Sequence, residues 1–162
     1  MHYTLNMAKW QKIFVIICVI VVIIIIVINF IGDKRNPSFK KAYVGDNLVW
    51  VIIAQTPEER KQGLSGIKKL AKDKGMLFIL ADKQKPVFWM KNMNFALDVV
   101  WIANNKVVDL TENIPTSLAG IPDSKIVRFQ PKTAVDIVLE LNAGWIEEKN
   151  VKIGDEFYCE PI

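Results

Sequence analysis

Histidine is nearly absent from this chain of 162 residues, because its one histidine, His2, lies beside the N-terminus. The rest of the chain therefore has no imidazole, which excludes Ser-His-Asp and Cys-His arrangements for nucleophilic catalysis. It also excludes His-based zinc sites. We accordingly expect no metal ion and no cofactor, and any catalysis would need carboxylates, lysine, a Ser-Lys pair or a hydroxyl group.

Cysteine is scarce too, and several binding motifs are missing. The two cysteines, Cys18 and Cys159, lie far apart in the sequence. We expect no internal disulfide, so cysteine usage leaves the redox compartment open. The chain also lacks both usual Gly-rich phosphate loops and the EF-hand calcium loop.

A basic surface is missing from most of the chain, although the net charge is +4. Residues 1–41 hold six basic residues and one acidic residue, a net charge of +5. Residues 42–162 hold 15 basic and 16 acidic residues, a net charge of −1. Nucleic-acid binding is therefore not expected, and the N-terminal cations fit anionic lipid head groups better.

A long apolar run does occur near the N-terminus. Residues 13–31, IFVIICVIVVIIIIVINFI, are 19 residues with one amide and no charge. About 20 apolar residues cross a bilayer as a helix, so this run predicts a transmembrane helix and membrane attachment. An uncleaved anchor is favoured over a signal peptide, because the run is long and no small-residue cleavage site follows it.

The orientation of that helix stays open on charge alone. Four basic residues follow the run and two precede it, which would place the C-terminal region in the cytoplasm. Long domains are translocated largely regardless of charge, however, and the short tail with Lys9 and Lys12 is typical of a signal-anchor.

The domain organisation follows from this run. We expect a short polar tail over residues 1–12, the helix over 13–31 and a polar linker over 32–41. Residues 42–162 then suit one compact domain.

Short strands dominate the predicted domain. Thr56 and Glu59 form a capping-box pattern around Pro57, which predicts a helix ending near Gly63 or Gly66. Asn104-Asn105 predicts a hairpin turn. Strands are expected over 48–54, 76–80, 87–90, 99–103, 106–110, 134–141 and 157–159, with a long loop over 114–132 and a helix or turn over 143–149. The fold class is thus α+β and β-rich, a small barrel or curled, mostly antiparallel sheet with short helices.

The candidate site lies in residues 88–102, FWMKNMNFALDVVWI, where polar side chains interrupt an apolar run. Asp98 either holds the fold together, through Lys91 or backbone amides, or faces a pocket. The Lys91 stem either covers the Trp89 indole or forms the polar rim of an apolar pocket. The candidate ligand-binding residues are Trp89, Lys91, Asn92, Asp98 and Trp101, and a second carboxylate could come from Glu140, Glu147 or Glu148.

Several motifs together resemble one family. They are Thr56-Pro-Glu-Glu-Arg-x-x-Gly-Leu64, Gly75-Met-Leu-Phe78, Phe88-Trp-Met-Lys-Asn92, Leu97-Asp98, Val138-Leu-Glu-Leu-Asn-Ala-Gly144 and Gly154-Asp155. In this order and spacing they resemble the DUF192 family, also called UPF0127, over roughly residues 48–158. The resemblance implies a small β-rich α+β domain but no activity, because the family is itself uncharacterised. Its members often carry an N-terminal signal or anchor, which implies that the domain lies outside the cytoplasm.

The chain departs from the family pattern at four positions. Ser65 and Ile67 stand where the family usually has Met and Arg, Met93 replaces a Thr, and Ala96 replaces a common Pro. The missing Arg weakens any scheme in which it binds an anionic ligand, and the missing Thr removes a hydroxyl from the cluster.

Three functions are consistent with these observations. The preferred hypothesis is a membrane-anchored, non-catalytic binding module for a small molecule, a glycan or a cell-envelope protein. The second is a metal-independent, hydrolase-like enzyme that uses Asp98 with Lys91 and Asn92. The third is a structural or protein-interaction domain.

Overall fold

The computed structural model describes residues 4–32, 38–117 and 120–161, with the backbone alone over 4–9, 11 and 26–32. Residues 1–3 of the predicted tail and 33–37 of the predicted linker lie outside the described residues. The chain divides into two compact units, and the division falls between Ser38 and Phe39 in the sequence.

The first unit contains one long helix, α1 (Thr4–Gly32). This helix includes the predicted membrane segment, residues 13–31, and the described side chains from 12 to 25 are all exposed. In the part of the chain that the structure describes, no helix is both long enough and apolar enough to count as a membrane span. The structure therefore supports the helix but not its transmembrane character.

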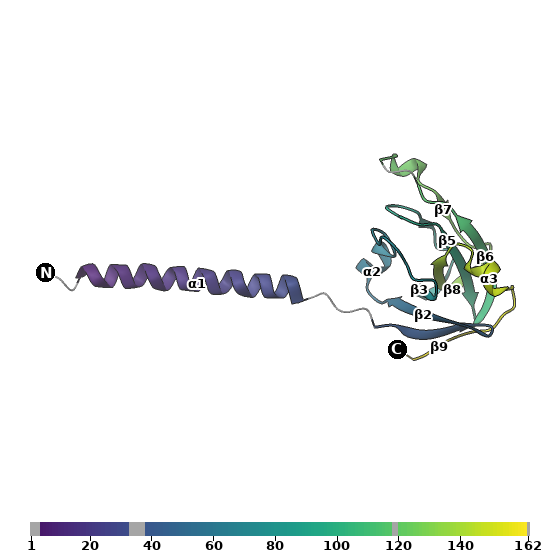
Figure 1. The fold of residues 1–162 in the computed structure, drawn as a ribbon, viewed down its shortest axis with the longest axis horizontal. Helices are drawn as coiled ribbons and strands as arrows, with labels where there is room; N and C mark the ends of the chain where they lie inside the picture. Colours follow the sequence, from purple (N-terminus) through teal and green to yellow (C-terminus); the bar gives the residue numbers. More distant parts are fainter. Residues whose placement is uncertain (1–3, 33–37, 118–119, 162) are drawn as a thin grey trace. The chain divides into compact units, whose positions relative to one another are not determined.

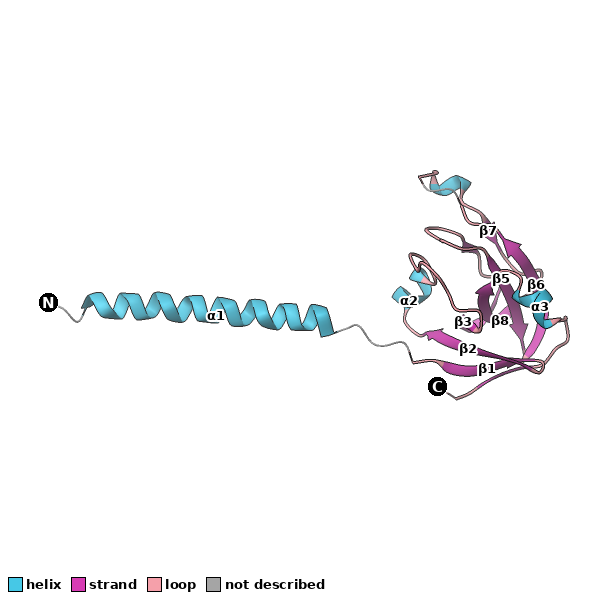
Figure 2. Cartoon of the chain, viewed as in Figure 1, coloured by secondary structure: helices cyan, strands magenta, loops and turns pink. Residues whose placement is uncertain are grey.

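The second unit is a β-rich domain (Figure 1, Figure 2). Its main sheet has the strand order β6-β5-β8-β3-β2-β1-β9, and β4 pairs with β7 in a small second sheet. The strands are β1 (Lys40–Val44), β2 (Asn47–Ala54), β3 (Lys74–Gln84), β4 (Phe88–Trp89), β5 (Leu97–Ala103), β6 (Lys106–Ile114), β7 (Arg128–Phe129), β8 (Val135–Asn142) and β9 (Phe157–Cys159).

The main sheet curls, as the sequence predicts. Its edge strands, β6 and β9, approach each other at one end, where Lys106 forms a single antiparallel bridge with Glu156. Beside this bridge the Val107 N–H donates to the Asp155 carbonyl at 2.9 Å. The result is a half-barrel, since the contact does not continue along the two strands.

All strand pairs of this sheet are antiparallel except β2 with β3. A parallel pair needs a crossover connection, and here α2 (Pro57–Gln62) provides it. This βαβ unit was not expected from the sequence, but its helix was predicted correctly. Thr56 and Glu59 form the capping box, and the helix ends at Gly63.

Both faces of the sheet are buried against apolar side chains. On β8, Leu139 and Leu141 belong to one cluster, whereas Val138 belongs to the other, because side chains alternate along a strand. The first core lies inside the curl and includes α3 (Trp145–Lys149). The second core lies on the opposite face, under β4, β7 and the segment after α2.

The other predicted strands are present, although β3 and β6 each extend four residues beyond the predicted ends of 76–80 and 106–110. The Asn104-Asn105 turn joins β5 to β6 with φ values of 53° and 58°, as a hairpin of this type requires. The sequence analysis missed β1 and β7, as well as a 3₁₀ turn, η1 (Asp123–Lys125), inside the predicted loop 114–132.

Candidate functional site

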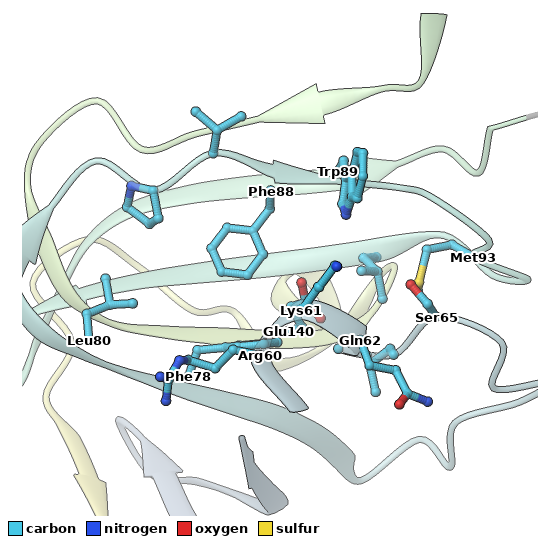
Figure 3. Close-up of a pocket in the computed structure, with 15 residues that line it drawn as sticks. Arg60, Lys61, Gln62, Ser65, Phe78, Leu80, Phe88, Trp89, Met93 and Glu140 are labelled. Carbon is cyan, nitrogen blue, oxygen red and sulfur yellow. The ribbon is translucent and has the colours of Figure 1, made fainter. Parts of the chain in front are cut away.

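A cleft of about 260 Å³ opens on the face of the sheet that carries the second core (Figure 3). Phe88 and Trp89 of β4 lie along one side, while Glu140, Lys61 and Arg60 lie on the other. Most of its lining is apolar. The lining side chains are Arg60, Lys61, Gln62, Leu64, Ser65, Phe78, Leu80, Pro86, Val87, Phe88, Trp89, Met93, Leu97 and Glu140, together with Gly63.

Glu140 forms the floor of this cleft. It lies on β8 between Met76 of β3 and Val99 of β5, both of which are apolar members of the second core. Its side chain is 5% exposed. Within the described residues its carboxyl group makes no hydrogen bond and no ion pair, although buried carboxyl groups normally have such partners.

Burial changes the protonation of Glu140. Desolvation by burial raises the pKa of its carboxyl group from 4.5 to about 8. At neutral pH the empty cleft therefore holds mainly the neutral acid, which can donate its O–H or, on meeting a cation, release its proton.

Gly63 leaves the space above Glu140 open. A Cβ atom at this position would lie 3.9 Å from Glu140 Oε2 and 3.5 Å from Phe78 Cζ. The backbone of Gly63 has a φ of 52°, which side chains other than hydrogen rarely allow. The end of α2 can therefore turn directly over the carboxyl group without filling the cleft.

Aromatic rings form the opposite wall. Phe88 packs edge-on against Phe78, with ring centroids 5.1 Å apart, and stacks on Phe129 at 5.9 Å. These contacts fix the position of Phe88, since each ring is held by another. The cleft thus has a rigid apolar wall facing its single carboxyl group.

Two cations stand at the mouth. Arg60 and Lys61 are exposed on α2, whose N-terminal Thr56 cap fixes the helix. Arg60 Nη1 donates to the Gln55 carbonyl at 2.8 Å, which leaves its other N–H groups available. Lys61 makes no ion pair with any described residue.

Trp89, one of the predicted site residues, does line the cleft. Its side chain is 37% exposed, and the Lys91 Nζ atom lies 4.9 Å from the ring centroid. Arg128 Cζ lies 5.7 Å from the same centroid. A cation–π contact between Lys91 and Trp89 is therefore present, in agreement with the alternative in which the Lys91 side chain covers the indole.

Lys91 and Asn92 lie in an adjoining hollow of about 490 Å³, which shares Lys61 and Trp89 with the cleft. Lys91 Nζ forms an ion pair with Asp123 Oδ2 at 2.5 Å. Asn92 has a φ of 56° and accepts a hydrogen bond from the Gly66 N–H at 2.9 Å through its backbone carbonyl. Both residues are near the cleft but outside it.

Asp98 is not brought together with them. Its side chain is fully buried on the face of the first core, because Asp98 pairs with Leu141 across the sheet. Its two oxygens accept hydrogen bonds from the Asn113 N–H at 2.8 Å and the Ile146 N–H at 2.9 Å. Of the two structural interpretations, the one with backbone amides is therefore correct, and Lys91 is not its partner.

Trp101 stands behind the cleft rather than in it. Its side chain is fully buried and packs on Phe88 and Phe129. Its Nε1–H donates to Thr111 Oγ1 at 2.8 Å. Trp101 therefore supports the aromatic wall from the second core.

Comparison with known families and structures fits this architecture. The model of the DUF192 family, described as "Uncharacterized ACR", matches residues 41–158, most of the chain. The chain belongs to the DUF192 family. No curated protein matches it.

Two solved structures share the DUF192 fold of this chain. One is a proposed transcription regulator from Sinorhizobium meliloti 1021, with 27% identity and a TM-score of 0.67 over 78% of this chain and 97% of that chain. The other is a protein of unknown function from Novosphingobium aromaticivorans, with 20% identity and a TM-score of 0.68 over 78% of this chain and 89% of that chain. The second likeness shows the fold alone.

The main residue of the DUF192 cleft, Glu140, entered the sequence analysis only as a possible partner for Asp98. The two carboxyl groups lie on opposite faces of the sheet, so they form no dyad. A signal was present in the sequence, because Glu140 interrupts the apolar stretch 137–141 at a position that alternation assigns to a buried face. The other two candidates, Glu147 and Glu148, lie exposed on α3.

Proposed function

We propose that this DUF192 domain is a non-catalytic binding module and that its ligand is a small molecule held in the cleft above Glu140. One observation carries the proposal: a buried carboxyl group without a partner in the described residues faces an open, apolar cleft. Such a group lowers the stability of the empty protein. A ligand that hydrogen-bonds to it would recover that free energy.

The dimensions and lining of the cleft suit a small ligand. Small-molecule sites are mostly apolar with a few placed polar groups, and they usually measure about 300–1,000 Å³. This cleft has that composition but measures only about 260 Å³. We therefore expect a ligand smaller than a typical drug molecule. An extended glycan or a protein surface fits this cleft less well.

An enzyme is the second candidate function, but Asp98 is no longer the residue that favours it. The carboxyl group that favours it is Glu140, whose pKa is raised to about 8, near the value a general acid needs at neutral pH. Each carboxylate oxygen of Asp98 accepts a hydrogen bond from a backbone amide, and Asp98 shares no described cleft with Lys91. Among the residues lining the cleft, Glu140 is the one carboxylate, so a two-carboxylate glycosidase mechanism has no second member there.

We also propose that α1 anchors the domain to a membrane and that the domain lies outside the cytoplasm. This proposal rests on the sequence, where residues 13–31 contain no charged side chain. The exposed apolar side chains of residues 13–25 agree with a lipid environment. The cleft would then meet ligands at the cell envelope. A regulator of transcription would need a nucleic-acid surface, for which the net charge of −1 over residues 42–162 gives no basis.

Thermal shift of the full-length protein in mild detergent against a library of small metabolites tests the binding function. Compounds that bind in the cleft are expected to raise the Tm of the wild type and not that of Glu140→Leu, which fills the floor with an apolar group. Glu147→Gln, an exposed glutamate on α3, is the matched control and should respond like the wild type.

Two outcomes would decide against the proposal. If no compound distinguishes the wild type from Glu140→Leu, the cleft is not a binding site. If bound compounds are chemically converted, as followed by mass spectrometry, and Glu140→Gln stops the conversion, the enzyme replaces the binding module.

A further inference from the structure

The ionisable groups of the cleft are arranged by depth. Glu140 is only 5% exposed and forms the floor, whereas Arg60 and Lys61 are exposed, and these three are the ionisable side chains among the residues that line the cleft. Building on the proposed binding function, we propose that the ligand is a small zwitterion whose ammonium group pairs with Glu140 and whose anionic group meets Lys61 and Arg60.

The floor is complementary to an ammonium group. Glu140 offers two carboxylate oxygens with no competing donor among the described residues, and an ammonium group supplies up to three N–H donors. The rings of Phe78 and Phe88 flank the same space, and aromatic faces attract cations. A carboxylate beside aromatic rings recognises organic cations, because both groups attract a positive charge. A neutral ligand would interact with either the carboxylate or the rings, but not with both in this way.

The mouth disfavours a simple amine. A ligand with a positive charge alone must pass Arg60 and Lys61, which repel it. Glu58 of the same helix lines the adjoining hollow with Lys61 but does not line the cleft. An attached anionic group turns this repulsion into attraction. Lys61 has no ion-pair partner in the described part of the chain, and Arg60 retains free N–H groups, so both are available to it.

The part of the ligand between its two charges must be apolar. Leu80, Val87 and Met93 also line the cleft and present no charge. Met93 contributes a thioether to this lining. Amino acids with an apolar side chain and ω-amino acids with an alkyl chain both have this chemistry.

Isothermal titration calorimetry with the full-length protein tests the charge requirement. The probes are two zwitterions with different charge spacing, L-phenylalanine and 6-aminohexanoate, with the amine-only and acid-only counterparts of each: phenethylamine, 3-phenylpropionate, hexylamine and hexanoate. The better zwitterion is expected to bind at least tenfold more tightly than either of its counterparts. The neutral 3-phenylpropionamide should bind more weakly still.

Two variants separate the two ends of the ligand. Glu140→Gln should lower the affinity for the zwitterion and the amines at least tenfold and leave the affinity for the acids unchanged. Lys61→Gln should weaken the zwitterion and the acids and leave the amines unchanged or slightly tighter. Lys68→Gln, an exposed lysine outside the cleft, is the matched control and should change nothing.

Proton release gives an independent readout. An ammonium group bound at Glu140 forces the carboxyl group to ionise, so binding at pH 7 should release nearly one proton. The binding heat would then depend on the ionisation enthalpy of the buffer. Glu140→Gln should abolish this dependence.

The outcomes separate this inference from the binding function. One of the other probes (3-phenylpropionamide, an acid or a simple amine) could bind as tightly as the better zwitterion, in a manner that depends on Glu140. The proposal of a zwitterionic ligand would then be wrong, and the binding function would stand. If no probe and no library compound binds in a Glu140-dependent manner, the binding function fails, and the inference fails with it.

Discussion

At the scale of single residues, Glu140 and Asp98 show how neighbouring carboxyl groups differ in role. Glu140 has no described partner and faces a cleft, whereas Asp98 accepts two backbone N–H groups inside the first core. The strands that carry them are paired, but the two side chains leave the sheet on opposite faces. One carboxyl group is therefore open to ligand chemistry and the other is used by the fold.

The pH dependence of stability tests the environment of Glu140. Burial raises the pKa of its carboxyl group from 4.5 to about 8 in the folded state. The folded state holds this proton more tightly than the unfolded state, so proton binding stabilises the folded state. This stabilisation is complete below about pH 4 and is lost as the pH rises through about 8. Urea denaturation should show the wild type losing at most about 5 kcal/mol relative to Glu140→Gln between pH 4 and pH 9.

The control for this prediction is Glu147→Gln. This glutamate is exposed, so the variant should follow the wild type across the same pH range. A difference between wild type and Glu140→Gln that stays constant with pH would show that the carboxyl group is not desolvated.

Asp98→Asn tests a structural role. The asparagine side chain has one oxygen, so its NH₂ group would face a backbone N–H and leave a buried donor unpaired. The expected loss is about 3 kcal/mol of unfolding free energy in urea, with ligand binding at the cleft unchanged. Asp123→Asn removes an exposed ion pair with Lys91 and should cost less than about 1 kcal/mol. A stable Asp98→Asn variant that loses binding would instead place Asp98 in the site.

At the scale of elements, the approach of β3 to β8 depends on Gly75. A Cβ atom there would lie 2.7 Å from the Glu140 backbone carbonyl and 3.0 Å from Leu141 Cδ2. This contact sets the distance between the strand that carries Glu140 and its neighbour.

Two alanine substitutions separate contact from backbone strain. Gly75→Ala should lower the unfolding free energy by about 3 kcal/mol, because the carbonyl it meets is part of the sheet and cannot move away. Gly66 has a φ of 78° but open space around its Cα, so Gly66→Ala should cost only about 1 kcal/mol from the backbone conformation. Urea denaturation of both variants measures the difference, and equal losses would contradict a specific contact at Gly75.

Most elements follow from local sequence, and the exceptions have physical reasons. The capping box around Thr56, the Asn104-Asn105 hairpin and the long strands are encoded by short patterns that need no distant partner. By contrast, β7 is only two residues long and pairs with the predicted strand β4 through Phe129 and Phe88, which come from distant parts of the chain. A two-residue strand has no periodicity, so its partner became visible only in the structure.

At the scale of the whole molecule, the proposed membrane anchor can be tested by cell fractionation. The full-length chain should remain with membranes after carbonate extraction. The double variant Ile20→Lys with Ile24→Lys should move to the soluble fraction, because each charge at a helix centre costs about 3 kcal/mol of insertion free energy. Ile153→Lys adds a charge to an exposed position of the domain and is the control.

Two further results bear on this anchor. A wild-type chain found in the soluble fraction would refute it. If the chain is membrane-bound, protease added to intact cells should remove the domain, and a protected domain would place it in the cytoplasm.

The sequence by itself determined the mostly β fold with short helices, the α2 cap, the hairpin and the family, because these depend on local patterns or on an ordered set of motifs. It also directed attention to residues 88–102, of which Trp89 lines the cleft. Only the tertiary structure decided which carboxyl group is available for binding. Asp98 and Glu140 lie on neighbouring strands with similar apolar surroundings, and their roles differ because strand register turns one toward backbone amides and the other toward an open cleft.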